Sequence, residues 1–274
     1  MEFRPCTSMP PQLRELTAEI IEEFIRQKVE ESRSDGVVIG LSGGIDSATT
    51  SKLCEEAIGA EKVLNLFLPS RSTPKGDLAD ARGFCEREGM ELRVVDVEPS
   101  IKAFESMLPE ARRAELRGNV AARCRMIVLF HHAKMMNRLV MGTSNKSELL
   151  VGYFTKFGDG GADFCPIGDL YKTEVRLLAK KLGIPKKIIE KVPSAGLWPG
   201  QTDEGELGIS YDELDAVLAA MELNIPLEEV SKRGGVAMDK VTKVWEMHRA
   251  TVHKRKTPLI PKLGVRTIGL DWRE

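Results

Sequence analysis

A short polar loop reads Ser42-Gly43-Gly44-Ile45-Asp46-Ser47. Serine and glycine ahead of a helix suit phosphate binding, because backbone N–H groups point outward and glycine permits close approach. No lysine follows the two glycines, so the loop is not a Walker A loop. An acid at the helix start suits a bound phosphate only if it holds a cation such as Mg²⁺. The alternative for Asp46 is an ordinary capping aspartate, and the whole motif favours the phosphate site.

A second candidate stretch reads Gly142-Thr143-Ser144-Asn145-Lys146-Ser147-Glu148. Thr143 could touch a nucleotide, and Glu148, one helical turn further on, could join Asp46 on Mg²⁺. The alternative is an Asn-capped helix with a solvated glutamate, which the pattern alone slightly favours. Ser70-Arg71-Ser72 is a third polar stretch of this kind.

These three stretches each follow an apolar run that reads as a buried strand. We expect strands over 37–41, 62–68, 92–97 and 138–143. Helical patterns separate them, and this alternation requires parallel strands with crossover helices. The sequence therefore predicts a Rossmann-like α/β fold, a parallel sheet with helices on both faces. In such sheets ligands bind outside the carboxyl ends of the strands, where all three stretches lie.

The remaining elements follow from hydrophobic spacing. Helices are expected over 13–33, 74–88, 99–107, 109–137, from 145, and over 169–182, 211–223, 226–230 and 236–253. The centre of the fourth, 126–130, is apolar on more than one face, so the helix is either sandwiched or at a subunit interface. Residues 1–10 look loosely ordered, 192–209 read as an irregular loop, and the tail from 257 has no assignment. The C-terminal part from about 205 is expected to be helical.

Composition restricts the function class. The chain has 274 residues, 30% charged residues and a net charge of −1, which argues against a dedicated RNA or DNA binder. No signal peptide or membrane-spanning apolar run is found, so we expect a cytoplasmic protein without membrane contact.

Cysteine and histidine give no sign of a metal or redox site. The cysteines are odd in number and scattered, without a C-x-x-C pair: Cys6, Cys54, Cys85, Cys124 and Cys165. Cys54, Cys85 and Cys124 have apolar neighbours and are expected to be small core residues. His131 and His132 lack a partner at ligand spacing, so a core or interface role is favoured.

The loop S-G-G-x-D-S resembles the pyrophosphate loop of the N-type ATP pyrophosphatases, which cleave ATP between the α- and β-phosphates. Longer stretches resemble the ammonia-dependent NAD synthetases, over nearly the whole chain to about Lys254. They are Gly142 to Glu148, Gly152-Tyr153-Phe154-Thr155-Lys156-Phe157-Gly158-Asp159-Gly160-Gly161-Ala162-Asp163, Pro166 to Arg176 and Pro193 to Glu204. The resemblance implies an adenine nucleotide alpha hydrolase-like fold, one synthetase domain over 1–274, and a homodimer.

The same resemblance implies a carbon–nitrogen ligase of NAD biosynthesis. The carboxylate of nicotinic acid adenine dinucleotide (deamido-NAD⁺) attacks the α-phosphorus of ATP, giving an acyl-adenylate and pyrophosphate. Ammonia then displaces AMP to give NAD⁺. ATP is a co-substrate and Mg²⁺ the implied cofactor, held where charge develops on pyrophosphate.

Site residues are also implied by resemblance. Asp46, Glu148 and Lys172 are the implied catalytic residues, and Asp46 and Glu148 the metal ligands. The implied ATP contacts are Gly40, Leu41, Ser42, Gly43, Gly44, Ile45, Asp46, Ser47, Thr143, Lys172 and Ser194. The implied deamido-NAD⁺ contacts are Arg123, Lys156, Asp163, His253 and Lys254.

Each deamido-NAD⁺ residue also has an ordinary alternative. Arg123 sits where a helix-surface arginine is the default, with Arg125 as a near competitor. Lys156 could be a solvated charge and Asp163 a turn residue, and His253-Lys254 could complement a helix dipole.

Two further expectations concern the path of the reaction. The glycines at 158, 160 and 161 suggest a mobile lid that would keep water from the adenylate. The chain starts almost directly at the synthetase fold, so no glutaminase domain is expected, and ammonia is either free or supplied by a partner.

Two other classes remain in competition. One is another adenylating relative, such as a GMP synthetase core or a tRNA-thiolating enzyme; the charge, the missing cysteine pairs and the poor match outside the loop count against it. The other is a nucleotide-binding module resembling universal stress proteins or electron-transfer flavoproteins, which would not need Asp46 and Glu148 as a pair.

Overall fold

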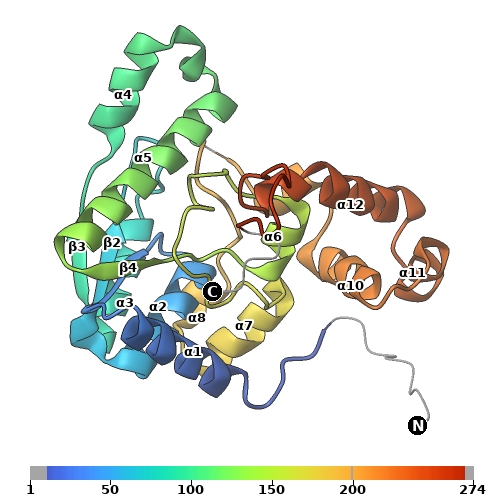
Figure 1. The fold of residues 1–274 in the computed structure, drawn as a ribbon, viewed down its shortest axis with the longest axis horizontal. Helices are drawn as coiled ribbons and strands as arrows, with labels where there is room; N and C mark the ends of the chain where they lie inside the picture. The colour runs from blue at the N-terminus through green and yellow to red at the C-terminus, as the bar shows by residue number, and fades with distance from the viewer. Residues whose placement is uncertain (1–10, 199, 269–274) are drawn as a thin grey trace.

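The computed structural model, which describes residues 11–198 and 200–268, contains a four-stranded parallel sheet (Figure 1). The strands are β1 (Gly36–Gly40), β2 (Val63–Phe67), β3 (Glu91–Val94) and β4 (Arg138–Met141), in the order β3-β2-β1-β4. Val37 of β1 is level with Val63 of β2 and Leu139 of β4. The predicted parallel α/β fold is confirmed.

Helices cover both faces of the sheet, as the alternation along β1 requires. Val37 and Ile39 pack on one face with α1, α2, α3, α7 and α8, whereas Val38 packs on the other with α4 and α5. These helices are α1 (Thr17–Glu31), α2 (Ile45–Ile58), α3 (Asp77–Glu88), α4 (Glu98–Met107), α5 (Ala114–Met135), α7 (Lys172–Lys181) and α8 (Lys186–Ile189).

A separate apolar cluster holds the C-terminal helices together. It is built around Tyr211, Leu214, Val217 and Leu218, and Val151 of α6 joins it. The helices are α6 (Lys146–Val151), α9 (Asp203–Leu207), α10 (Tyr211–Glu222), α11 (Leu227–Gly234) and α12 (Met238–Ala250). This cluster lies beside the sheet rather than on it, and α6 connects the two (Figure 1).

Several boundaries differ from the sequence prediction. The helix expected from 109 is a 3₁₀ turn, Pro109–Arg112, followed by α5, because Arg113 between them is extended. The helices expected from 74 and 169 begin later, at Asp77 and Lys172, after turns that precede them. The short helices α8 and α9 were missed, and α9 lies inside the stretch expected to be irregular.

The chain reverses its order in the sheet between β1 and β4. β2 and β3 are added on one side of β1, and β4 on the other. The loops after β1 and β4 therefore leave adjacent strand ends in different directions, which is where open α/β sheets bind ligands. The S-G-G-I-D-S loop and the 142–148 stretch meet at this point.

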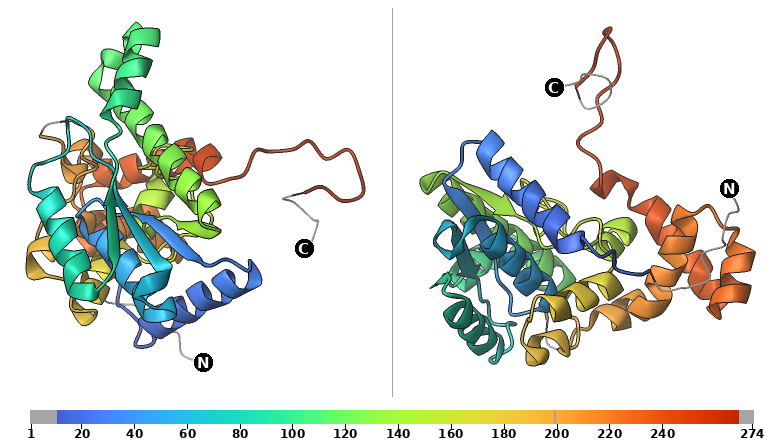
Figure 2. Two further views of the ribbon diagram at one scale, coloured as in Figure 1. Left: turned by 90° about the vertical axis from the view of Figure 1, so that its left-hand side faces the viewer. Right: turned by 90° about the horizontal axis from the view of Figure 1, so that it is seen from below.

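The remaining described features are peripheral to the sheet. Cys54, Cys85 and Cys124 are buried, as predicted, while Cys6 and the expectation for 1–10 fall outside the described residues. After the 3₁₀ turn Val252–Lys254, the segment up to 268 projects from the body (Figure 2). Within 11–198 and 200–268, no helix is long and apolar enough to cross a bilayer.

Candidate active site

The loop after β1 is closed by its own serines. Ser47 Oγ accepts from the Ser42 backbone N–H at 3.2 Å and donates to the Gly44 carbonyl at 3.0 Å. Gly43 has φ +80°, and a Cβ there would lie 2.8 Å from the Asp77 carbonyl oxygen, so only glycine fits. The loop is therefore fixed directly before the N-terminus of α2, where N–H groups without helical partners favour an anion.

Asp46, Glu148 and Lys172 meet at the ends of β1 and β4, and we call them the charged triad. The Lys172 ammonium donates a hydrogen bond to Asp46 and lies 3.6 Å from Glu148 Oε1. Only 2% of the lysine side chain is exposed. Three segments that are far apart in the sequence thus place one positive and two negative groups together.

Asn145 explains how Glu148 is held. Its Oδ1 accepts from the Glu148 N–H at 3.0 Å, and Glu148 Oε2 accepts from the Asn145 N–H at 3.3 Å, which forms a capping box. Asn145 Nδ2 also donates to Asp46 Oδ1 at 3.0 Å. The predicted Asn-capped helix is therefore confirmed, but Glu148 is mostly buried rather than solvated.

The pKa values of Glu148 and Lys172 are both raised, but for different reasons. Burial raises the pKa of Glu148 to about 8, the Asp46 carboxylate adds to this, and Lys172 opposes it. Burial alone would lower the pKa of Lys172, but Asp46 and Glu148 outweigh burial and hold that pKa above its ordinary value. The triad thus keeps its lysine charged.

The residues present fit a divalent cation. The same Lys172 atom lies within reach of both carboxylates, so one cation can contact Asp46 and Glu148 together. Among the described residues, no cluster of three or more His, Cys, Asp and Glu side chains is suited to a metal ion. Two carboxylates, completed by phosphate oxygens and water, are the usual protein contribution to a Mg²⁺ site.

Two tyrosines and an aspartate lie behind Glu148. The Tyr211 hydroxyl lies 3.4 Å from Glu148 Oε1 and donates to Asp203 Oδ2 at 3.1 Å. The Tyr153 hydroxyl lies 3.2 Å from Asp203 Oδ1. Burial raises the pKa of Asp203, against the effect of Lys172 and both hydroxyls. α9 and α10 thereby reach the site.

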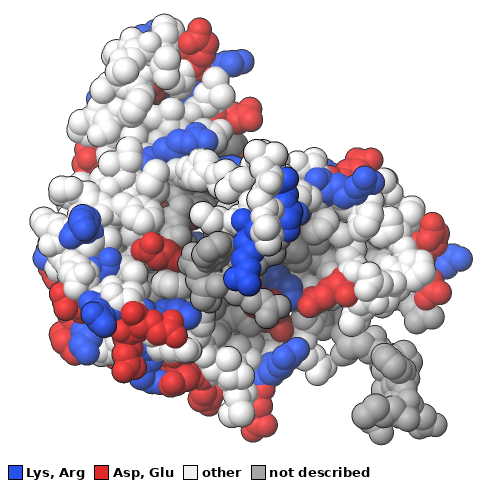
Figure 3. Space-filling view, in the orientation of Figure 1, with Lys and Arg blue, Asp and Glu red and all other residues white. Residues whose placement is uncertain are grey.

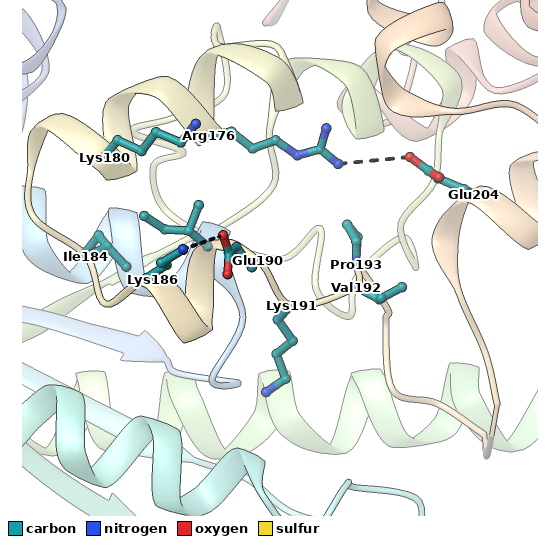
Figure 4. A pocket seen from close by; sticks show the side chains of 10 residues that line it. Arg176, Lys180, Ile184, Lys186, Glu190, Lys191, Val192, Pro193 and Glu204 are labelled. Atoms are coloured by element: carbon teal, nitrogen blue, oxygen red, sulfur yellow. Dashed lines mark ion pairs between the residues drawn. The ribbon is translucent and has the colours of Figure 1, made fainter.

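Lys191 fixes the loop after β1 in place. Its Nζ donates to the Gly43 carbonyl at 3.1 Å and to Asp77 Oδ1 at 2.6 Å, so it joins the loop to α3. Beside it lies an open hollow of about 770 Å³ between α7, α8 and the segment after α8. Arg176 extends over this hollow toward Glu204, while Lys186 pairs with Glu190 (Figure 4). The hollow borders the loop but contains no member of the triad.

The other residues implied for ATP lie around this loop. Thr143 follows β4 and is half-buried. Ser194 is exposed, and its hydroxyl donates to the Gln201 carbonyl at 2.8 Å. The Gly196 carbonyl accepts from Ser72 at 3.1 Å, which brings this segment to the end of β2. The stretches after β1 and β4 therefore meet each other through Asn145 and Asp46, whereas the stretch after β2 contacts the segment that carries Ser194.

Arg123, Lys156, His253 and Lys254 form a second group, which we call the cationic cluster. Arg123 donates to the Lys156 carbonyl at 3.2 Å, and Lys156 Nζ donates to the His253 carbonyl at 2.8 Å. Lys254 Nζ donates to the carbonyls of Gly152 and Phe154 at 2.7 and 2.9 Å. The structure thus brings together four of the five residues implied for deamido-NAD⁺. Figure 3 shows several Lys and Arg side chains near the centre of the face in view.

Asp163 and Arg125 have other contacts. Asp163 exchanges backbone and side-chain bonds with Val140 of β4, at 2.9 and 2.7 Å, and so extends the sheet edge. Arg125 Nε donates to the Leu68 carbonyl at 3.0 Å, at the end of β2. Arg125 therefore faces the sheet, whereas Arg123 faces the cationic cluster.

Close packing accounts for the three glycines expected to form a lid. A Cβ at Gly158 would lie 2.9 Å from Ala122 Cβ, and one at Gly160 would lie 2.4 Å from the Phe154 ring. A Cβ at Gly161 would lie 3.0 Å from Met126. The glycines have a packing reason and do not by themselves indicate a lid, which stays a prediction.

Sequence reasoning missed Tyr211, Asp203, Lys191 and Asp215 in or behind the site. Of the residues that hold the charged triad in place, only Asn145 had a signal in the sequence, its capping position three residues before a glutamate. The others act across more than 30 residues of chain, or stand in helices whose periodicity is satisfied by core packing.

Comparison with known proteins places this geometry in a family. The family model described as NAD synthase matches residues 17–258. The NH(3)-dependent NAD(+) synthetase of Methanococcoides burtonii is 46% identical over 256 residues, which cover 93% of this chain and 97% of that protein. The enzyme of the same name from Thermococcus kodakarensis is 47% identical over 245 residues, 89% of this chain and 96% of that one.

Solved structures agree with the sequence comparison. The NMN synthetase of Francisella tularensis superposes with a TM-score of 0.80 at 36% identity, covering 89% of this chain and 97% of that one. The NH3-dependent NAD synthetase of Campylobacter jejuni, solved with a nitrate ion, gives a TM-score of 0.77 at 35% identity, covering 90% and 97%.

Proposed function

Because this chain belongs to the NAD synthase family, we propose that it is an ammonia-dependent NAD⁺ synthetase. Deamido-NAD⁺ attacks the α-phosphorus of ATP through its carboxylate, and pyrophosphate leaves. Ammonia then attacks the acyl carbon of the adenylate, AMP leaves, and NAD⁺ results. The adenylate is needed because a carboxylate oxygen is a poor leaving group until it is esterified.

The phosphate loop and the charged triad serve the first step. The N–H groups at the start of α2, with Ser42 and Ser47, bind the β- and γ-phosphates, and Lys172 donates to the phosphate oxygens. Asp46 and Glu148 hold Mg²⁺. When bound, Mg²⁺ neutralises the charge that develops on the leaving pyrophosphate. Lys172 is suited to donate to phosphate oxygens because its pKa is held high and its ammonium already lies between the two carboxylates.

The cationic cluster serves the dinucleotide. Arg123, Lys156 and Lys254 donate to backbone carbonyls, which are neutral and do not cancel their positive charges, and the Asp159 carboxylate acts on Lys254. Uncancelled cations at a half-exposed surface attract the phosphates of a dinucleotide. Asp163 retains acceptor capacity beyond its bond with Val140, because a carboxylate has about four acceptor sites.

One observation carries the proposal most directly. A buried lysine bridges two carboxylates at the ends of β1 and β4, directly beside a glycine loop at a helix N-terminus. A nucleotide-binding module without catalysis has no use for a second buried carboxylate there, since burying Glu148 costs free energy.

The test is a product analysis. The protein is incubated with deamido-NAD⁺, ATP, Mg²⁺ and ammonium, and products are resolved by chromatography. We expect NAD⁺ with equimolar AMP and pyrophosphate, and no NAD⁺ when glutamine replaces ammonium. Cleavage of ATP to AMP without formation of NAD⁺ would mean that the enzyme adenylates a different acceptor. A folded, ATP-binding sample with no acceptor-dependent cleavage contradicts the proposal.

The same assay decides between two acceptors. A solved relative carries the name NMN synthetase, so the acid form of the mononucleotide is the competing substrate. We expect a higher kcat/KM with deamido-NAD⁺, because the cationic cluster lies on segments apart from the triad and can contact the additional phosphate. A higher kcat/KM with the mononucleotide would reverse the assignment of the acceptor.

We propose a homodimer as the working form. Ile127 and Met135 on α5 are more than half exposed, which suits an interface between copies. Light scattering after gel filtration is expected to give twice the mass of the 30.4 kDa chain. A monomer that is fully active would contradict this proposal.

A further inference from the structure

The helix α7 begins with Lys172, and its own sequence caps it only in part, because Glu174 Oε2 accepts from the Tyr171 N–H at 2.9 Å. Tyr171 stands at the capping position, and its hydroxyl donates to Glu222 at 2.7 Å instead. The first N–H groups of a helix have no partners within the helix and need acceptors from elsewhere. Here the Lys172 N–H donates to Ser147 Oγ at 2.9 Å, and the Thr173 N–H donates to Asp215 Oδ2 at 2.8 Å. Other helices therefore fix the start of α7.

Asp215 connects the two helix starts. Its Oδ1 accepts from the Ser147 hydroxyl at 2.5 Å, and its Oδ2 accepts from both the N–H and the hydroxyl of Thr173, each at 2.8 Å. Asp215 is completely buried, and Ser147 and Thr173 are also buried. One carboxylate of α10 thus holds the residue after Lys172 and the residue before Glu148.

We propose that Asp215 is a positioning residue that sets the spacing between Lys172 and Glu148. It does not touch the substrates. Its two oxygens fix the first turns of α6 and α7 relative to each other, and hence fix where the lysine ammonium meets the carboxylate. Groups that orient metal ligands typically contribute 10–100-fold to metal affinity or activity. This inference rests on the proposed function of the triad.

A carboxylate is the group that this place requires. It receives three donors and needs to donate none, whereas an asparagine would direct an amide N–H₂ at one side. The Ser147 hydroxyl accepts from the Lys172 N–H and donates to Asp215. An amide N–H₂ at position 215 that pointed at Ser147 would place two donors opposite each other. Burial raises the pKa of Asp215, and the three donors counteract this.

The test compares Asp215→Asn with Glu213→Gln. Glu213 lies on the same helix and is also hydrogen-bonded, but to Ser210 and Lys240, away from the triad. For Asp215→Asn we expect kcat to fall about 100-fold, while KM for deamido-NAD⁺ changes less than about twofold. Glu213→Gln should retain wild-type constants. Ser147→Ala and Thr173→Val, which each remove one donor, should lower kcat about tenfold and keep the fold.

A second readout does not depend on turnover. Calorimetry measures ATP affinity with and without Mg²⁺, and the Mg²⁺-dependent gain should fall about tenfold in Asp215→Asn. Wild-type kcat and wild-type Mg²⁺ dependence in folded Asp215→Asn overturn the proposal, as does an activity loss that matches only the unfolded fraction. If the wild type makes no NAD⁺, the proposed function fails, and the calorimetric comparison still decides the role of Asp215.

Discussion

The charged triad and the cationic cluster are both assembled from distant segments, but their charges have different partners. In the triad, the partners are opposite charges: Lys172 lies between Asp46 and Glu148, and nearly all of its side chain is buried. In the cationic cluster, Lys156 and Lys254 donate to backbone carbonyls and remain half-exposed.

This difference determines how each region responds to change. Removing one partner of a buried pair leaves an uncompensated charge, which is strongly unfavourable. Removing a half-exposed lysine from a carbonyl leaves an oxygen that water can reach. The triad is therefore suited to hold a fixed geometry for chemistry, and the cationic cluster to attract a substrate while tolerating substitution. Four predictions test this contrast.

The largest effect is expected for Asp46→Ala. It removes one candidate ligand of Mg²⁺ and one partner of Lys172, so acceptor-dependent ATP cleavage should fall by about 10³-fold or more. ATP binding by the loop N–H groups should persist and can be measured by calorimetry. Glu56→Gln, which loses a pair with Lys52 on the far turn of α2, is the control and should keep its activity. Retained turnover in Asp46→Ala would remove the triad from the mechanism.

The next effect concerns the stability of α5, which carries Arg123. Glu98 accepts from buried Arg117 at 2.8 and 2.6 Å. Burial would raise the pKa of Glu98, but the bonds from Arg71 and Arg117 outweigh it and hold that pKa below its usual value of 4.5. Such a group stabilises the fold above its unfolded pKa and loses this contribution as pH falls through the folded pKa.

Glu98→Gln should therefore lower the free energy of unfolding by about 3 kcal/mol at neutral pH. In urea titrations the difference from wild type should shrink once pH falls below 4.5 and through the lowered folded pKa. Glu91→Gln, which removes an exposed pair with Arg93, should cost about 0.5 kcal/mol or less. A Glu98→Gln deficit that is constant with pH would mean that the carboxylate charge is not what stabilises this pair.

A smaller effect is expected for Lys191→Met, which tests whether the loop after β1 binds ATP independently of the cationic cluster. Losing the bonds to Gly43 and Asp77 loosens the phosphate loop, so KM for ATP should rise about tenfold. KM for deamido-NAD⁺ should stay unchanged in the same steady-state measurements. Equal increases in both constants would show that Lys191 acts on the whole fold.

The smallest effect is expected for Lys156→Met in the cationic cluster. KM for deamido-NAD⁺ should rise about fivefold at low salt, and less at high salt because exposed charges are screened. KM for ATP should not change. Lys134→Met, an exposed lysine on α5, is the matched control and should have no effect. A rise in KM for ATP alone would place Lys156 with the nucleotide.

The sequence predicted the order of strands and helices well where hydrophobic spacing is regular. β1, β2, β4 and α10 lie within one to two residues of their expected bounds. Short elements were less predictable: α8 and α9 have four and five residues, too few for a periodic pattern. The start of α5 was wrong because the extended backbone of Arg113 leaves no trace in the side-chain pattern.

By itself, the sequence determined the glycine loop between β1 and α2, because glycine conformation and helix start are local properties of neighbouring residues. It also named Asp46, Glu148 and Lys172 through resemblance. Only the tertiary structure decided that Lys172 bridges the two acids, that Lys191 supports Gly43, and that Asp215 holds both helix starts. These contacts join segments brought together by packing, and a hydrogen bond across 42 or 148 residues leaves no periodicity from which to predict it.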